Sequence, residues 1–147
     1  IPVAIVKLKV FAYVHENHGS TRYEFGLLSN RIAIVQGMAI VQNNMMGMIA
    51  LQKNSVNTSF QSILRNQVDL ALIPEFSALK QASKHLRKHI VPLHPAVYEV
   101  PMYHYVTKKH EHLVESLTRS LKSMQKQQLI TQVTKSYKTI LAADAEA

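Results

Sequence analysis

Two of the chain's eight histidines have the spacing of a metal chelate. His85 and His89 are four residues apart in a segment with helical periodicity, so one helix face could present both imidazoles. Lys84, Arg87 and Lys88 surround the pair with positive charge, which disfavours a bound cation. None of the histidines falls in a zinc motif such as HExxH. The sequence therefore predicts no metal site.

The sequence shows no recognisable motif for covalent catalysis. The chain contains no cysteine, and no serine stands in a GxSxG elbow. Of the nine acidic residues, Asp69 alone lies on an apolar run. We interpret Asp69 as an anchor for the start of that run, with direct contact to a ligand as the alternative. The chain is expected not to be an enzyme and to use no cofactor.

Gly37 marks a candidate anion site. Residues 31–36 form a short apolar run that predicts a buried strand, and residues 39–51 have the composition and length of a helix. A glycine between them permits a tight turn. The free N–H groups of the helix's first turn would then face a carboxylate or another anion beyond the strand. The alternative is an ordinary strand–turn–helix unit without a ligand, since one glycine is much weaker evidence than a glycine-rich fingerprint.

Composition limits the class of protein. The 147 residues are 47% hydrophobic and 18% charged, as expected for one globular domain. The net charge is +8, but the lysines and arginines are scattered, so we do not expect nucleic-acid binding. The apolar runs are too short to span a membrane. Because the chain begins at Ile1, we interpret it as a processed protein or an excised piece.

The order of the expected elements predicts an α/β fold with a mainly parallel sheet. Two long extended runs enclose a compact region, and we expect them to lie side by side as chain crossings. Strands are predicted over residues 3–14, 31–36, 68–73, 90–93 and 98–107, and helices over residues 39–51, 58–66, 75–89, 109–124 and 127–141.

Three phrases of the sequence form a pattern in their order and spacing: LLSNRIAIVQGMA at residues 27–39, ILRNQVDLALI at residues 63–73, and YHYVTKKHEHLVESLTRSLKSMQKQQLI at residues 103–130. Together they resemble the solute-binding protein family 3, the substrate-binding proteins of amino-acid-type ABC transporters. The resemblance implies the type 2 periplasmic-binding fold, in which two lobes are joined by two crossing strands. It also implies a periplasmic protein that binds a small polar solute, amino-acid-like or another small anion, and delivers it to a membrane permease.

The resemblance divides the chain into three parts. Residues 1–19 would be the first crossing strand and a loop, residues 20–97 the complete second lobe, and residues 98–147 the return crossing with the C-terminal helices of the first lobe. The start of the first lobe would then be missing, which predicts a homo-oligomer or strand exchange between copies. The same fold also serves sensory and regulatory proteins, so a ligand-sensing domain is the alternative function.

The ligand-binding residues implied by the resemblance are Gly37, Met38, Ala39, Pro74 and Glu75. Two departures from the family pattern affect them. Pro74 occupies the position where the family often has an acidic residue, and Glu75 follows it. Met38 and Ala39 stand where amino-acid binders commonly offer a threonine hydroxyl. The two lobes would close around the ligand by a hinge motion.

Overall fold

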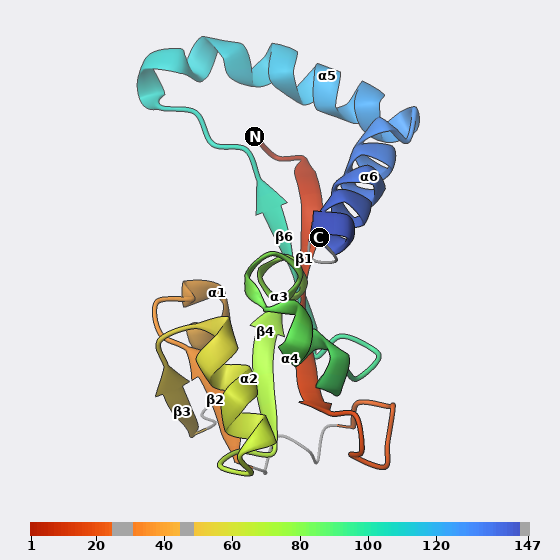
Figure 1. Ribbon diagram of the computed structural model, residues 1–147. Helices are drawn as coiled ribbons and strands as arrows, with labels where there is room; N and C mark the ends of the chain where they lie inside the picture. Colours follow the sequence, from red (N-terminus) through yellow and green to blue (C-terminus); the bar gives the residue numbers. More distant parts are fainter. Residues whose placement is uncertain (25–30, 45–48, 145–147) are drawn as a thin grey trace.

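One long strand, β1 (Ala4–His15), runs from the compact body of strands and helices toward the C-terminal helices (Figure 1). The computed structural model describes residues 1–24, 31–44 and 49–144. Its first half pairs with β6 (Tyr98–Tyr103). Its second half pairs with β4 (Leu70–Pro74) on one side and β5 (Ile90–Pro92) on the other. All three pairings are antiparallel. The prediction that the two long extended runs lie side by side is confirmed.

The remaining strands complete a six-stranded mixed sheet in the order β3-β2-β4-β1-β5, with β6 also on β1. β2 (Ile32–Val35) is parallel to both β3 (Ala50–Lys53) and β4. The prediction of a mainly parallel sheet is therefore wrong, because β1 runs against each of its partners. Every residue of β2 and β4 is buried, which explains their unbroken apolar sequences.

Helices α2 (Val56–Leu64), α3 (Glu75–Gln81) and α4 (Lys84–His89) cover one face of the sheet (Figure 1). Phe11 and Tyr13 of β1 pack on this face with Phe60 of α2. The opposite face buries Val10, Ala12 and Val14 of the same strand. Alternate side chains of β1 thus enter two separate hydrophobic cores.

The predicted helix over residues 39–51 is wrong. The helix α1 (Ala39–Gln42) has four residues, and Ala50–Lys53 forms strand β3 instead. Residues 45–48 of the prediction lie outside the described part of the chain. Local composition favours a helix here, but pairing with β2 places residues 50–53 in the sheet, where tertiary context overrides propensity.

Other helix boundaries also differ from the sequence prediction. Helix α2 starts at Val56 because Ser55 forms a capping box with Thr58, so neither Thr58 nor Ser59 is the cap. The single helix predicted over residues 75–89 is divided into α3 and α4. Ala82 is extended at the break, and Ser83 caps α4 while its N–H donates to Asn57 Oδ1 at 2.9 Å.

The C-terminal helices form an arm beyond the sheet (Figure 1). It consists of the 3-10 helix η2 (Lys108–Leu113), α5 (Val114–Lys126) and α6 (Leu129–Asp144). Gln128 turns the chain between α5 and α6 with a φ of 59°, a left-handed conformation that glycine adopts at lower cost. No helix in the described residues is long and apolar enough to cross a membrane.

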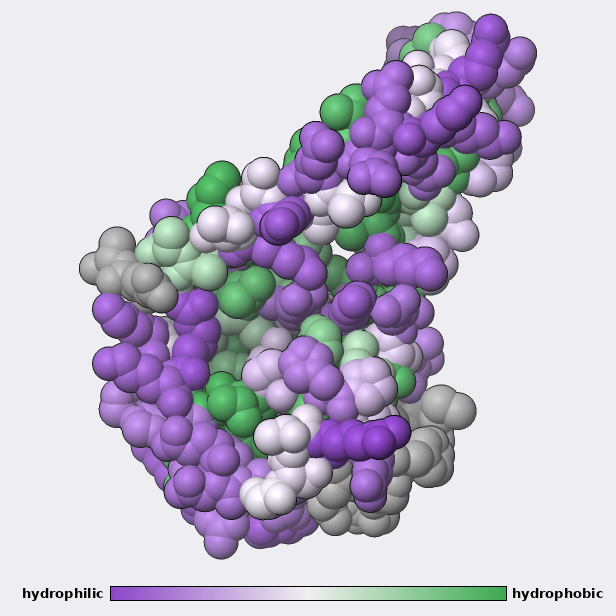
Figure 2. Space-filling model, turned by 90° about the vertical axis from the view of Figure 1, so that its right-hand side faces the viewer, coloured by the Kyte–Doolittle hydropathy of each residue, from purple (hydrophilic) through white to green (hydrophobic). Residues whose placement is uncertain are grey.

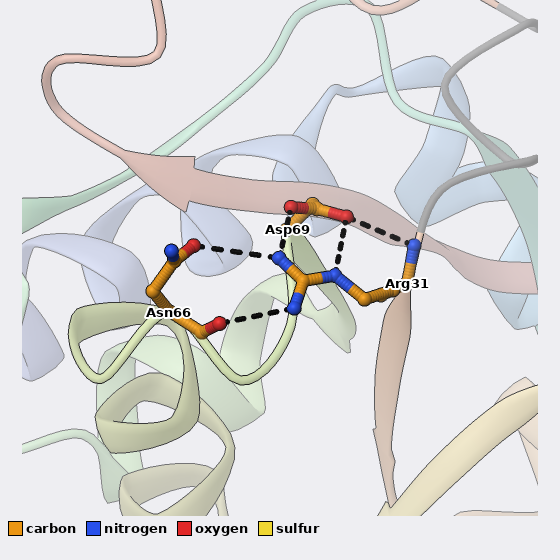
Figure 3. A network of polar contacts seen from close by, with 3 residues as sticks. All are labelled: Arg31, Asn66 and Asp69. Carbon is orange, nitrogen blue, oxygen red and sulfur yellow. Dashed lines mark hydrogen bonds and ion pairs between the residues drawn. The ribbon is translucent and has the colours of Figure 1, made fainter.

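The starts of β2 and β4 are tied together by Arg31, Asn66 and Asp69 (Figure 3). Asp69 Oδ2 accepts from Arg31 Nε at 3.1 Å and from the Arg31 backbone N–H at 3.0 Å, and Oδ1 accepts from Nη2 at 2.9 Å. Nη1 of Arg31 donates to the Asn66 carbonyl. This arrangement agrees with the interpretation of Asp69 as a structural anchor.

We predict that Asp69→Asn lowers the melting temperature at neutral pH and removes part of the pH dependence. Hydrogen bonding to Arg31 lowers the pKa of Asp69 in the folded chain. At pH values between this lowered pKa and the ordinary value of about 3.9, the unfolded chain therefore binds more protons than the folded chain. The stabilisation from Asp69 is fully present above about pH 3.9 and is lost as the pH falls through the lowered pKa. Melting curves of parent and variant should converge in acid. Glu115→Gln, which removes an exposed ion pair with Arg119, is the matched control. Parallel pH profiles of the melting temperature for Asp69→Asn and the parent would contradict the stabilising role of Asp69.

Candidate functional site

The five sequence-predicted ligand residues lie where β2 and β4 end. Because these strands are parallel and adjacent, their carboxyl ends meet at one edge of the sheet. Gly37, Met38 and Ala39 follow β2, whereas Pro74 ends β4 and Glu75 begins α3. Gly37 and Ala39 are exposed, Met38 and Glu75 are half-buried, and Pro74 is buried. The structure thus gathers the five residues along one edge.

The Gly37 turn differs in detail from the predicted anion site. Gly37 has a φ of 82°, so the position favours glycine, as expected. The N–H of Met38 donates to the Val35 carbonyl at 3.3 Å, and the N–H of Ala39 donates to the Gly37 carbonyl at 3.0 Å. Both groups therefore have local acceptors. Helix α1 is also only about one turn long, so its dipole contributes little to anion binding.

Glu75 is held by a residue that sequence reasoning did not identify. Its Oε2 lies 2.7 Å from Nζ of Lys138 on α6. The same ammonium lies 5.5 Å from the centre of the Phe76 ring, and that ring lies 5.7 Å from the ring of Tyr137. These contacts attach the start of α3 to the arm. Sequence spacing gives no signal for a pair formed between such distant segments.

Tyr98 brings the return crossing to the same edge. Tyr98 of β6 is opposite Val10 of β1, and Val10 is in turn opposite Pro74 of β4. The Tyr98 hydroxyl donates to the Ile40 carbonyl of α1 at 3.4 Å. Burial raises the pKa of Tyr98 to about 12, so the hydroxyl stays protonated and remains a donor at neutral pH. A crossing strand is therefore in direct contact with helix α1, which follows the Gly37 turn.

The two histidines with the spacing of a metal chelate lie on helix α4. His85 and His89 have their ring centres 5.3 Å apart on α4. Nδ1 of His89 is 2.7 Å from Oε1 of Glu16, which connects the end of α4 to the loop after β1. Within the described ranges, no group of three histidine, aspartate or glutamate side chains has an arrangement that could hold a metal ion.

The edge offers groups that can recognise a polar molecule by hydrogen bonding. Glu75 supplies a carboxylate that already binds an ammonium, so it can also bind an amino group. The turn after β2 and the start of α3 lie at the same edge, and the N–H groups of Met38 and Ala39 in that turn already have local acceptors. Tyr98 and the crossing strands lie directly beside them.

Comparison with known proteins identifies the fold. No protein-family model matches the chain, and no curated protein matches its sequence. Among solved structures, the GluR0 ligand-binding core in complex with L-glutamate has a TM-score of 0.68 at 14% identity, over 90% of this chain. The AvGluR1 ligand-binding domain in complex with glutamate has a TM-score of 0.68 at 14% identity, over 93% of this chain. A mutant of ArgBP from T. maritima has a TM-score of 0.60 at 13% identity, over 91% of this chain.

The chain spans about 60% of the length of these structures, since it covers 61%, 60% and 59% of the three chains. It has the α/β fold of type 2 periplasmic-binding proteins, with one lobe, two crossing strands and the C-terminal portion of the other lobe. At these identities the similarity establishes the fold, and the ligand must be argued from the site itself.

We predict that Gly37→Ala lowers the free energy of unfolding by about 1–2 kcal/mol, because an L-residue is strained at a positive φ. Nothing lies within 4 Å of a Cβ at this position, so the cost comes from the backbone conformation. Gly37→Asn should cost less than Gly37→Ala, since asparagine tolerates the left-handed region better. Urea denaturation measures the three proteins, and equal stability of parent and Gly37→Ala would contradict the turn geometry.

Proposed function

We propose that the chain is the ligand-binding module of a two-lobed receptor for a small polar solute, amino-acid-like or another small anion. The observation that carries this proposal is the edge where Gly37, Met38, Ala39, Pro74 and Glu75 meet beside the crossing strands. Two of the solved structures with this fold are complexes with glutamate, which supports an amino-acid-like ligand.

Glu75 would bind the amino group of such a ligand. In the structure the Glu75 carboxylate is paired with the Lys138 ammonium of α6 at 2.7 Å. A ligand ammonium would therefore replace a positive charge that the site already accommodates. The exchange would also release a contact between α3 and the arm, which connects ligand binding to the position of the arm.

Closure would then require the ligand itself to contact both the compact body and the arm. The compact body and the arm are joined through β1 and β6, whose paired segment is mostly half-exposed or exposed. A ligand that contacts both parts shifts the population toward the closed form by its difference in affinity between the two forms. No covalent step is needed, so the proposal is a binding protein and not an enzyme.

The wider role proposed here is the extracytoplasmic, periplasmic component of an ABC-type transporter, which would pass its solute to a membrane permease. The alternative is a ligand-sensing domain of a signalling or regulatory protein with the same fold. The coding sequence upstream of Ile1 discriminates between them. A signal peptide supports transport, whereas a DNA-binding or kinase module supports sensing.

Isothermal titration calorimetry with the common amino acids and with inorganic anions tests the binding site. We expect saturable binding of at least one amino acid, and Glu75→Gln should weaken it by about tenfold or more because a charge-assisted hydrogen bond is lost. Gly37→Val should also weaken binding by placing a branched side chain at the turn. Glu99→Gln is the matched control, because Glu99 lies on β6 and pairs only with Lys7 and Lys9 at 3.9 and 3.7 Å among the described residues. Unchanged affinity in both Glu75→Gln and Gly37→Val would show that the ligand binds elsewhere. Absence of binding for every amino acid and inorganic anion tested would refute an amino-acid or small-anion ligand.

We further predict that the 147-residue chain self-associates through the arm. Val133, Tyr137 and Ile140 of α6 are 65%, 44% and 55% exposed. Figure 2 shows hydrophobic residues among hydrophilic ones on the upper part of the molecule. Burying such side chains is worth roughly 1.5–3 kcal/mol each. Sedimentation should show dimers or larger species, and Val133→Lys with Ile140→Lys should shift them toward monomer. A parent chain that stays monomeric at all concentrations would rule out this association.

A further inference from the structure

A small cavity lies between the sheet and helices α2, α3 and α4, on the helix-covered face. Its volume is about 230 Å³. Phe11 and Tyr13 of β1, Phe60 of α2 and Ile90 of β5 form apolar walls, and Arg87 of α4 also lines it. The cavity differs from the sheet edge proposed above, although Glu75 at the start of α3 borders both.

The aromatic walls of the cavity support one another. The rings of Phe11 and Tyr13 are 6.4 Å apart at 75°, and those of Tyr13 and Phe60 are 5.3 Å apart. His94 lies with its ring 5.1 Å from Phe11 and also lines the cavity. Edge-to-face and tilted packing of this kind stabilises the contacts between the rings. The aromatic part of the cavity wall is therefore supported by its own ring contacts.

Two hydrogen-bond donors at the cavity are available to a ligand. One is the hydroxyl of Tyr13, a residue that lines the cavity and is only 7% exposed. Nε of Arg87 is buried without a partner, and Nη1 makes a long hydrogen bond of 3.4 Å to the Leu79 carbonyl. A buried donor without an acceptor is costly, so each such group in a folded protein calls for an explanation.

The hydrogen-bond donors of Arg87 and Tyr13 determine the charge of a suitable ligand. A guanidinium can only donate hydrogen bonds. Burial, followed by the nearby Glu75 charge, raises the pKa of Tyr13, so its hydroxyl is protonated and can donate as well. The Glu75 carboxylate is compensated by Lys138 at 2.7 Å, which limits its repulsion of an anion. The cavity therefore presents donors for an anionic acceptor within apolar walls.

We propose that this cavity binds a small organic acid with a single apolar ring, whose carboxylate accepts hydrogen bonds from Arg87 and the Tyr13 hydroxyl. The volume fits this class, because an apolar cavity of roughly 150 Å³ can hold benzene. The remaining space accommodates a carboxylate. The ring would lie against Phe11, Phe60 and Ile90.

Titration of the ¹⁵N-labelled 147-residue chain with sodium benzoate tests the proposal, and benzylamine serves as the cation of similar shape. We expect saturable shifts of the amide signals of Ala78, Leu79 and Ile90 with benzoate, and at least about tenfold weaker binding of benzylamine. Arg87→Gln should weaken benzoate binding about tenfold or more. Arg119→Gln, on the remote and exposed helix α5, should leave it unchanged.

Tyr13→Phe keeps the test decisive if Arg87→Gln fails to fold. The variant retains the ring and removes only the hydroxyl, so it should melt close to the parent temperature while binding benzoate several-fold more weakly. A purely structural hydroxyl would show the opposite pattern, with lower stability and unchanged affinity. Absence of saturable shifts with benzoate, tighter binding of benzylamine, or unchanged affinity in Tyr13→Phe would overturn the proposal.

Discussion

The structure depends on the pairing of β1 with three other strands. β4, β5 and β6 all form their antiparallel hydrogen bonds with this one strand. Its second half contributes alternate side chains to both hydrophobic cores, while its first half extends toward the arm. Disruption of β1 would therefore affect the compact body, the crossing and the attachment of the arm together.

The position of the candidate site follows from the parallel pair of β2 and β4. Parallel strands end at the same edge, and the chain must turn there before it enters a helix. Gly37 makes one of these turns and Pro74 leads directly into the other. The register of β4, β1 and β6 then brings Tyr98 to the same edge. Strand pairing alone thus assembles groups from three separate segments.

The sequence predicted elements with strong local patterns and missed those set by distant contacts. The apolar runs of β2 and β4 are buried on both faces, so composition alone identifies them. The helix predicted over residues 39–51 was wrong because the strand Ala50–Lys53 exists through its pairing with β2. The division between α3 and α4 depends on Asn57, which accepts the Ser83 N–H from another helix.

The same distinction applies to the site. Gly37 was identified because a positive φ restricts the choice of residue at one position. Lys138 was not identified, since its ion pair with Glu75 depends on how α6 lies against α3. The cavity beside Tyr13 was missed for a related reason, because its lining comes from two strands, three helices and the residue His94.

The pairing of Ala4 with Tyr103 has a consequence for synthesis of the chain. Strand β1 emerges from the ribosome before its partner β6, which follows only after most of the compact body has been made. At about 5–20 residues per second the delay is roughly 5–20 s. During that time the first half of β1 exposes an unpaired strand edge, which can recruit other nascent chains. Co-translational chaperone binding would be most valuable in this interval.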